Sequence, residues 1–579
     1  MHSRKAMLGV YALAAACDAS SRPNIVMVLT DDQDNWASLD YMPLLQRHST
    51  DHGTKFANHY CTVSICCPSR VDLWTGQAAH NTNVTNVSPP YGGYPKFVEN
   101  GLNDKWLPVW LQAQGYNTYY TGKLFNSHSV ENYNDPFVKG FNGSDFLLDP
   151  YTYAYWNATM TRNNAAPISY EGQYSPDVVA EKTYGWLDEA VFHEQPFFIV
   201  AAPVAPHSNQ DPKVPGVMSI PEYAPRHAHL FKNFTIPRTP NFNPASPSGV
   251  SWVKDLPQLN ETVIEYHDEY QRSRLRALQS VDEMVKQLVE RLDGYGLLEK
   301  TYVIFTTDNG YHISQHRLPP GKECAFETDI HIPFIVRGPG VPAGKIAEVV
   351  SSHTDLTPTI MKLAGADRPD LDGTPMPLSQ GALSAGSFGE HVNVEYWGKA
   401  LPEGKYGKIG SEPFSPGGPP ISARNNTYKA LRLVADEYSL LYTVWCTGER
   451  ELYDVRQDPG QTRNLLDAEG SAPSPDRLLL GRPLEDATAR LDAVLLVLKS
   501  CKARSCHKPW ESLHPDGGVR TLKDALDSRF DQFYIAQPKV SFSSCPLGHI
   551  ISEEGPQTVN VWEDASQAAN YPAHDYLRV

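Results

Sequence analysis

The run Cys66-Cys67-Pro68-Ser69-Arg70 places a cysteine four residues before a side chain that always carries a positive charge. Two adjacent cysteines are consistent with a structural role. Cys66 beside Arg70 is equally consistent with a reactive thiolate, because a neighbouring cation favours the deprotonated form. The residue types alone leave both alternatives open.

Two acidic pairs far apart in the chain are candidate metal ligands. Asp31-Asp32 and Asp308-Asn309 each follow an apolar run. Four converging oxygen ligands suit a hard cation such as Ca²⁺ or Mg²⁺ better than zinc, which prefers nitrogen and sulfur. One such pair by itself is more typical of a turn or a helix cap. Two pairs at matching positions favour a metal site.

Four segments share the layout that would position these residues, a short apolar run that ends in polar or ionisable side chains. They are 24–29 before Asp31, 116–120 before Lys123, 197–200 before His207 and 302–306 before Asp308. Helix-like stretches lie between them, the clearest at 261–292 with Gly294 at the expected C-terminal cap. Alternating strands and helices predict an α/β layered sheet, in which ligands bind beyond the carboxyl ends of the strands.

The pattern of expected strands and helices changes near residue 389. Strand candidates at 391–396 and 439–444, a Pro/Gly-rich stretch at 414–420 and a helical run near 484–498 follow. We therefore expect a catalytic domain over residues 23–388 and a smaller C-terminal domain over residues 389–579, made of antiparallel strands with a helix.

Charge and the N-terminal segment restrict the class of protein. The formal net charge of −16 and the lack of a long Lys/Arg run argue against nucleic-acid and membrane-surface binding. Residues 1–19 have the basic start, apolar stretch and small residues of a secretory signal, and no other stretch is long enough for a membrane span. An anionic substrate would need a local positive site inside this acidic molecule.

Seven Asn-x-Ser/Thr sequons agree with a secreted or lumenal, N-glycosylated protein. They begin at Asn83, Asn86, Asn142, Asn157, Asn233, Asn260 and Asn425. Nine cysteines are too few for a disulfide scaffold, and we predict only one pair, Cys501 with Cys506.

The Cys66 run continues to Thr75-Gly76, and the whole stretch resembles the type I sulfatase signature, Cys-x-Pro-Ser-Arg followed at fixed spacing by apolar residues and Thr-Gly. Residues 115–123 resemble the second sulfatase signature, and Pro206-His207 and the segment from Asp308 to Gly340 also match the family. The resemblance extends from about residue 24 to 464. It implies the alkaline-phosphatase-superfamily fold, a large mixed β-sheet sandwiched by helices plus a smaller C-terminal antiparallel sheet with a helix.

The resemblance also implies the chemistry. A formylglycine-generating enzyme that reads Cys-x-Pro-x-Arg would convert Cys66 to formylglycine, whose hydrate attacks sulfur with one hydroxyl and expels sulfate through the other. One Ca²⁺ would be held by the modified residue and by four further ligands. The implied roles are Asp31, Asp32, Cys66, Asp308 and Asn309 at the metal, Cys66, Arg70, Lys123, His207 and Lys322 in catalysis, and Asn126, His312 and Gln315 at the substrate.

Asn126 departs from the family pattern, since many members place a histidine soon after the lysine that matches Lys123. An amide cannot accept a proton at neutral pH, so the base that regenerates the aldehyde stays open, with His128 as a second candidate.

The expected reaction is hydrolysis of an aryl sulfate or a sulfated sugar, as in the arylsulfatase and N-acetylglucosamine-6-sulfatase branch. Tyr153, Tyr155 and Trp156 are candidates to stack on either kind of ring. The alternatives are a phosphodiesterase or phosphonate monoester hydrolase of the same superfamily and an inactive carbohydrate-binding relative.

Overall fold

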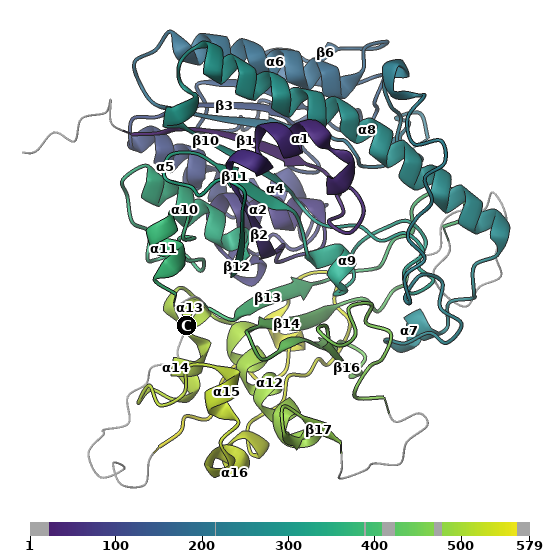
Figure 1. Cartoon of the computed structure of the whole chain (residues 1–579), viewed down its shortest axis with the longest axis vertical. Helices are drawn as coiled ribbons and strands as arrows, with labels where there is room; N and C mark the ends of the chain where they lie inside the picture. The colour runs from purple at the N-terminus through teal and green to yellow at the C-terminus, as the bar shows by residue number, and fades with distance from the viewer. Residues whose placement is uncertain (1–21, 215, 387–388, 408–422, 468–476, 564–579) are drawn as a thin grey trace, which may run out of the picture.

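The computed structural model describes residues 22–214, 216–386, 389–407, 423–467 and 477–563 (Figure 1). The predicted signal segment 1–19 and the Pro/Gly-rich stretch 414–420 lie outside the described residues. In the described part of the chain, no helix is both long and apolar enough to cross a bilayer.

A ten-stranded sheet dominates the described residues, in the order β12-β2-β11-β10-β1-β7-β3-β4-β5-β6. Four neighbouring strands at its centre run parallel to one another. They are β10 (Thr301–Thr307), β1 (Asn24–Thr30), β7 (Phe197–Ala202) and β3 (Asn117–Gly122). These are the four strands expected from sequence, so their carboxyl ends, and the polar residues that follow them, meet at one edge of the sheet.

The outer strands make the sheet mixed, because β11 pairs antiparallel with both β10 and β2. The outer strands are β2 (Thr54–Tyr60), β11 (Phe334–Arg337), β12 (Lys345–Ser352), β4 (Gly143–Leu147), β5 (Thr159–Arg162) and β6 (Ile168–Ser169). The predicted α/β class with a large mixed sheet is confirmed.

Helices cover both faces of this sheet, and the alternation of side chains along β1 explains why (Figure 1). Ile25 and Met27 pack on one face, under α2 (Cys66–Thr75), α5 (Leu107–Ala113) and α10 (Leu356–Leu363). Val26 and Val28 pack on the other, under α6 (Ser175–Val191) and α8 (Glu261–Gly294). A strand buried on both faces reads as a continuous apolar run, which is what segment 24–29 shows.

Helix α8 matches the predicted 261–292 closely at its N-terminus and differs at its end. The Asn260 side chain caps the helix by accepting a hydrogen bond from the Val263 N–H, at 3.0 Å. The predicted cap residue, Gly294, is the last residue of the helix instead. Gly296 takes the left-handed backbone with φ of 66°, so the glycine that relieves the turn lies two residues further on.

The second sheet has four antiparallel strands, in the order β13-β14-β15-β16. They are β13 (His391–Tyr396), β14 (Tyr428–Val434), β15 (Ser439–Trp445) and β16 (Arg450–Asp454). Helix α12 (Leu484–Leu498) has the predicted bounds and packs on one face. The other face shares a core with Tyr60 and Ile65 of the first part of the chain, so the two sheets are joined by one apolar cluster. The expected boundary at residue 389 stays a prediction.

Short elements complete the described part of the chain. The helices are α1 (Pro43–His48), α3 (Ala79–Thr82), α4 (Gly93–Glu99), α7 (Ser251–Lys254), α9 (Glu327–Ile330), α11 (Gln380–Ser384), α13 (Arg504–His507), α14 (Pro509–Leu513), α15 (Leu522–Ala525) and α16 (Asp531–Ile535); the strands are β8 (Asn209–Gln210), β9 (Met218–Ser219), β17 (Leu478–Leu479) and β18 (Arg482–Pro483). Figure 1 shows α12 to α16 gathered beyond the second sheet, away from α6 and α8.

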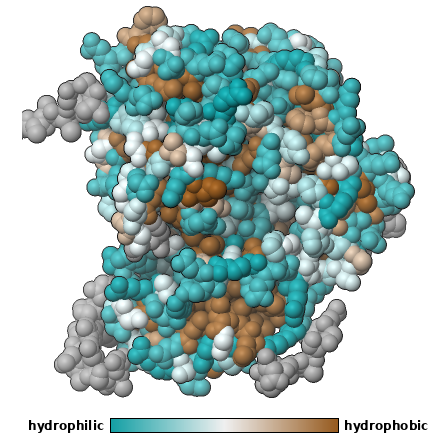
Figure 2. Space-filling model, in the orientation of Figure 1, coloured by the Kyte–Doolittle hydropathy of each residue, from teal (hydrophilic) through white to brown (hydrophobic). Residues whose placement is uncertain are grey.

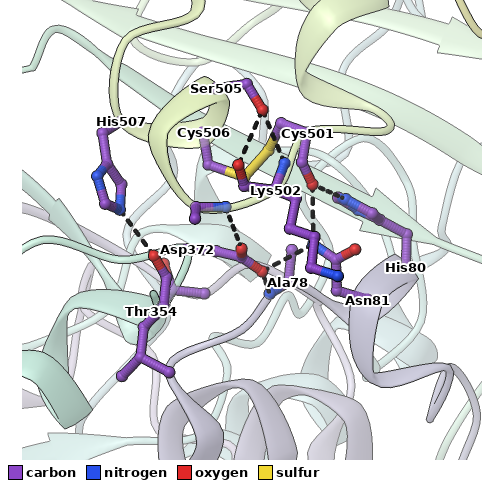
Figure 3. Close-up of a disulfide and its surroundings, with 12 residues drawn as sticks. Ala78, His80, Asn81, Thr354, Asp372, Cys501, Lys502, Ser505, Cys506 and His507 are labelled. Carbon is purple, nitrogen blue, oxygen red and sulfur yellow. Dashed lines mark hydrogen bonds between the residues drawn. A yellow bond between two sulfur atoms is a disulfide. The ribbon is translucent and has the colours of Figure 1, made fainter. Parts of the chain in front are cut away.

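The predicted Cys501–Cys506 disulfide is confirmed, and Figure 3 shows that its loop braces the segment after α2. The Cys501 carbonyl lies 2.7 Å from Nε2 of His80, and Asp372 accepts hydrogen bonds from the N–H groups of Ala78 and Ala503 at 2.9 and 2.7 Å. A second disulfide was not predicted. It joins Cys446 to Cys545, 99 residues apart, and leaves Cys61, Cys66, Cys67 and Cys324 as free thiols among the described residues.

A hollow of about 900 Å³ lies in the C-terminal part, beside α12. Its lining combines leucines with Arg450 and Lys539. Figure 2 shows apolar surface in this lower region of the molecule. The residues expected to do chemistry from sequence do not line this hollow, so it is not the site considered below.

Glu451 on β16 makes stability depend on pH. Burial raises the pKa of this carboxyl to about 7, against hydrogen bonds from Trp445 and Tyr453. The folded state therefore keeps a proton that the unfolded chain releases above its ordinary pKa of 4.5. Stability is lost as pH rises from 4.5 to 7, by about 3 kcal/mol for this group.

We expect the Glu451→Gln variant to lose this dependence, because an amide keeps the shape of the side chain and does not ionise. The melting temperature of the wild type should fall relative to the variant between pH 5 and 7.5, measured by differential scanning calorimetry. Parallel curves for the two proteins over this range would contradict the assignment.

Candidate active site

Cys66 is the first residue of α2 and is buried, with 2% of its surface exposed. Its Sγ lies 3.6 Å from Oδ1 of Asp31, 3.7 Å from Oδ1 of Asp32 and 3.4 Å from Nζ of Lys322. The sulfur therefore sits at the carboxyl ends of the central strands, where the strand order brings residues from distant parts of the sequence together.

Oxygen ligands surround this sulfur. One potential ligand atom from each of Asp31, Asp32, Cys66 and His207 lies within 4.8 Å of the others. Asp308 accepts a hydrogen bond from the Asp32 N–H at 3.0 Å, and Asn309 donates through Nδ2 to Oδ1 of Asp32 at 2.8 Å. The two acidic pairs predicted as metal ligands are therefore brought into one cluster.

Three cations balance the three carboxylates. Lys123 binds both oxygens of Asp31, at 2.7 and 2.6 Å, and Lys322 binds Oδ2 of Asp32. Nε of Arg70 lies 2.8 Å from Oδ2 of Asp308. The cluster is therefore close to neutral, and a divalent cation bound at these carboxylates would give it the positive charge that an anionic substrate would need.

The electrostatics of the site keep Asp32 and Asp308 charged and the Cys66 thiol protonated, whereas burial raises the pKa of Asp31 although Lys123 opposes it. Burial opposes ionisation of Asp308, but Arg70 and Lys123 outweigh it and lower the pKa of this carboxyl. Burial is also the largest influence at Asp32, but Lys322 and His207 together outweigh it and lower the pKa of this carboxyl. Burial raises the pKa of the Cys66 thiol well above its usual value, although both lysines oppose this. Cys66 is therefore a poor source of thiolate, which argues against the simple thiolate mechanism.

The site fits a hard divalent cation. Its donors are mainly carboxylate and amide oxygens, the ligands that Ca²⁺ prefers. Oδ1 of Asn309 is buried and accepts no hydrogen bond from the described residues, although Nδ2 of the same amide is fully engaged. A buried oxygen without a donor is costly, and a cation held with Asp31, Asp32 and Asp308 would satisfy it.

Aromatic side chains wall the cluster on the His207 side. The Tyr153 ring stacks on His207 with centroids 4.1 Å apart, and Nζ of Lys123 lies 4.8 Å from the centre of the same ring. Asn126 donates through Nδ2 to the Tyr153 hydroxyl at 2.7 Å, while its Oδ1 is buried with no partner in the described chain. Of the three aromatic candidates, Tyr153 is beside the site, whereas Tyr155 and Trp156 pack on Tyr174.

Three predicted candidates have their observed partners outside the Cys66 cluster, and their expected roles stay predictions. Nδ1 of His312 is held by Asp329 at 2.8 Å, and Oε1 of Gln315 accepts the Ile313 N–H at 2.6 Å. Neither makes a hydrogen bond or ion pair to the Cys66 cluster within the described residues. His128 lies between the rings of Tyr94 and Phe146, and burial lowers its pKa to about 4, so it remains neutral.

The sequence analysis did not predict the contacts of several residues that bind the backbone carbonyls or the cations of the cluster. Arg274 on α8 binds the carbonyl of Asp32 at 2.5 Å, and His353 and Ser69 contact the Asp308 carbonyl at 3.1 and 2.6 Å. Glu403 approaches Lys322 at 3.8 Å from the connection between β13 and β14. An arginine on the buried face of an amphipathic helix was a visible signal for Arg274, but nothing in the local sequence of Glu403 indicates its position.

Comparison with known proteins identifies relatives over most of the chain. The family model described as Sulfatase matches residues 23–366. An arylsulfatase of Volvox carteri is 36% identical over 93% of this chain and 84% of its own length. The human N-acetylglucosamine-6-sulfatase is 31% identical over 93% of this chain and 91% of its own length.

The fold is shared with solved structures at lower identity. One is a protein in complex with its substrate D-glucosamine-2-N,6-O-disulfate, with a TM-score of 0.60 and 19% identity, covering 77% of this chain and 94% of the other.

Proposed function

The chain belongs to the sulfatase family of sulfuric ester hydrolases, and we propose that it cleaves aryl or sugar sulfate esters to an alcohol or phenol and inorganic sulfate at the Cys66 site. The observation that carries the proposal is the convergence of Cys66 with three carboxylates and three cations in one buried cluster. Such a set of fixed charges suits a transition state whose negative charge spreads over several sulfuryl oxygens.

Two groups would complete this site. Formylglycine made from Cys66 by a formylglycine-generating enzyme would supply a nucleophile that can also release sulfate without a second attack. A Ca²⁺ held by Asp31, Asp32, Asp308 and Asn309 would supply Lewis-acid activation of that nucleophile.

We expect Arg70 to hold sulfate oxygens. Its Nε is fixed by Asp308 and its Nη1 donates to the Lys123 carbonyl at 2.7 Å. Its Nη2 is buried without a hydrogen bond in the described structure, so this N–H₂ remains available to an oxygen of the substrate. Lys123 and Lys322 add positive charge on either side.

We expect His207 and Lys322 to protonate the leaving oxygen. Nδ1 of His207 lies 2.8 Å from the Ser208 carbonyl, which can only accept, so Nδ1 carries a proton. The proton given to the leaving oxygen would be a second one, on Nε2, which faces the cluster 3.4 Å from Oδ2 of Asp32. The Lys322 ammonium is 3.4 Å from Sγ of Cys66. Asn126 cannot take a proton, and its unpartnered Oδ1 instead suits a hydroxyl donor of the substrate.

The proposed substrate class rests on the side chains next to His207. Tyr153 offers an aromatic surface beside His207, and Asn126 offers a hydrogen-bond acceptor. A phenyl ring or a sugar ring would both use these features. The relatives named arylsulfatase and N-acetylglucosamine-6-sulfatase support the same two classes.

A secreted or lumenal location agrees with the surface of the protein. Five of the seven sequon asparagines are exposed, namely Asn83, Asn142, Asn233, Asn260 and Asn425. Two disulfides fit an oxidising compartment. A relative in Caenorhabditis elegans is named a putative extracellular sulfatase.

Paired substrates test the proposal. We expect kcat/KM for 4-nitrophenyl sulfate to exceed that for 4-nitrophenyl phosphate by at least about 100-fold, because discrimination depends on differential binding of the two transition states. Steady-state rates of nitrophenol release measure both. A preference for the phosphate ester would overturn the proposal in favour of a phosphatase or diesterase.

A further inference from the structure

Glu403 is a buried carboxylate that reaches the site from the second half of the chain. It lies between β13 and β14 and is 3% exposed. Its backbone N–H donates to the Pro320 carbonyl at 2.8 Å, and the next residue, Gly404, donates to the Met218 carbonyl at 3.2 Å. These two hydrogen bonds hold the segment between the loop that carries Lys322 and the strand that contains Met218.

The two oxygens of Glu403 face different groups. Oε2 accepts hydrogen bonds from the hydroxyls of Ser208, Tyr311 and Tyr270, the last two at 2.6 and 3.5 Å. Oε1 lies 3.8 Å from Nζ of Lys322. Hydrogen bonds to an ionised acceptor are stronger than neutral ones, so three hydroxyls on Oε2 hold the carboxylate in one orientation with Oε1 toward the lysine.

This contact matters because a lysine side chain is flexible and carries a point charge. The Lys322 ammonium also binds Asp32 and lies 3.4 Å from Sγ of Cys66. Its position is thus set between the nucleophile and Glu403. Glu403 also reaches His207 indirectly, because it accepts from the hydroxyl of Ser208, the residue whose carbonyl holds the histidine ring.

We propose that Glu403 is a positioning residue that holds Lys322, and through Ser208 the neighbouring His207, in the place where they protonate the leaving oxygen. This inference rests on the proposed function. The simpler view is that Glu403 only compensates the charge of a buried lysine and stabilises the fold. The two views differ in whether the effect of Glu403 on catalysis passes through Lys322.

A double-mutant cycle separates them. Glu403→Gln, Lys322→Ala and the double variant are compared with the wild type on 4-nitrophenyl sulfate, for which wild-type turnover is established first. If the wild type does not turn over this substrate, the proposed function itself is contradicted, and this result is distinct from a failure of the inference about Glu403. We expect Glu403→Gln to lower kcat/KM by about 10- to 100-fold in the wild type and by less than about twofold in Lys322→Ala.

Two results would overturn the inference. One is a loss from Glu403→Gln that is the same in both backgrounds, because independent losses multiply. The other is a loss below about twofold in the wild type. A second readout is the dependence of kcat/KM on the pKa of the leaving phenol, which both Lys322→Ala and Glu403→Gln should steepen. An unchanged slope would also contradict the assignment.

Glu323→Gln is the matched control. Glu323 is adjacent to Lys322 and 2% exposed, and its Oε2 accepts the N–H of Leu401. Burial raises the pKa of its carboxyl well above the usual value, which favours the neutral form, and an amide keeps the shape of that form. We expect kcat/KM to stay within about twofold of the wild type.

Tyr311→Phe serves if Glu403→Gln does not fold, as judged by circular dichroism. It removes one hydroxyl from Oε2 and leaves Lys322 untouched. A loss of about threefold or more that disappears in the Lys322→Ala background supports the inference, and a loss that persists there contradicts it.

Discussion

Replacement of Cys66 by alanine is expected to abolish sulfate ester hydrolysis while the fold persists. The side chain is buried at the start of α2, in contact with Asp31, Asp32 and Lys322, and no other nucleophile of the described residues occupies that point. Loss of the nucleophile of an enzyme costs at least about four orders of magnitude in kcat. Release of nitrophenol, with circular dichroism of the same sample, measures activity and fold together.

Cys67→Ala is the matched control. Cys67 is the next residue of α2, fully buried in the apolar core beneath the sheet, and burial raises the pKa of its thiol to about 12. The proposed recognition run Cys-x-Pro-x-Arg tolerates any residue at this position. We therefore expect Cys67→Ala to keep its activity within a few fold, with a modest loss of thermal stability from the cavity.

Mass spectrometry of the peptide containing Cys66 tests the modification separately. Protein from a host with a formylglycine-generating enzyme should carry an aldehyde in place of the thiol, and so should Cys67→Ala. Fully active protein with an intact thiol would refute the formylglycine mechanism, and full activity of Cys66→Ala would point to another nucleophile.

Removal of divalent metal is expected to lower activity by more than about 100-fold, reversibly. Asp31 and Asp32 each bind one lysine ammonium, Lys123 and Lys322. A cation on the same carboxylates would compete for these oxygens, so chelation should leave both lysines bound where they cannot hold a sulfate. Activity is measured after chelation and dialysis, and again after addition of Ca²⁺, Mg²⁺ or Zn²⁺.

Thermal stability gives a readout that does not depend on turnover. Binding to the folded state alone stabilises it by about 2.7 kcal/mol at a concentration 100 times Kd, so Ca²⁺ should raise the melting temperature of the dialysed protein. The oxygen-rich ligand set predicts a larger effect for Ca²⁺ than for Zn²⁺. Full activity of a protein shown by elemental analysis to hold no metal would contradict the site.

Two asparagines with unpartnered buried oxygens distinguish metal binding from substrate binding. Asn309→Ala removes an expected metal ligand and should raise the Ca²⁺ concentration needed for half-maximal activity. Asn126→Ala removes an oxygen beside Tyr153 and should raise KM for the sulfate ester at an unchanged Ca²⁺ requirement. If Asn309→Ala changed only KM and Asn126→Ala changed only the Ca²⁺ requirement, the two assignments would be contradicted.

The sequence by itself determined those features that depend on neighbouring residues. Apolar runs predicted the four central strands, a helix-like stretch at 261–292 predicted α8, and α12 was predicted with its observed bounds. The Cys501–Cys506 disulfide belongs to the same group, since the two cysteines are only five positions apart in the sequence. The motifs around Cys66 and Lys123 indicated the chemistry, because several of the candidate catalytic residues come directly after predicted strands in the sequence.

Only the tertiary structure decided which distant residues meet. The strand order places Asp31, Lys123, His207 and Asp308 at one edge, and the turn after β13 brings Glu403 to Lys322. Cys446 pairs with Cys545 across 99 residues, and His312, although part of a motif, turns to Asp329. Contacts between distant segments depend on packing of the whole core, and no local pattern of residue types records them.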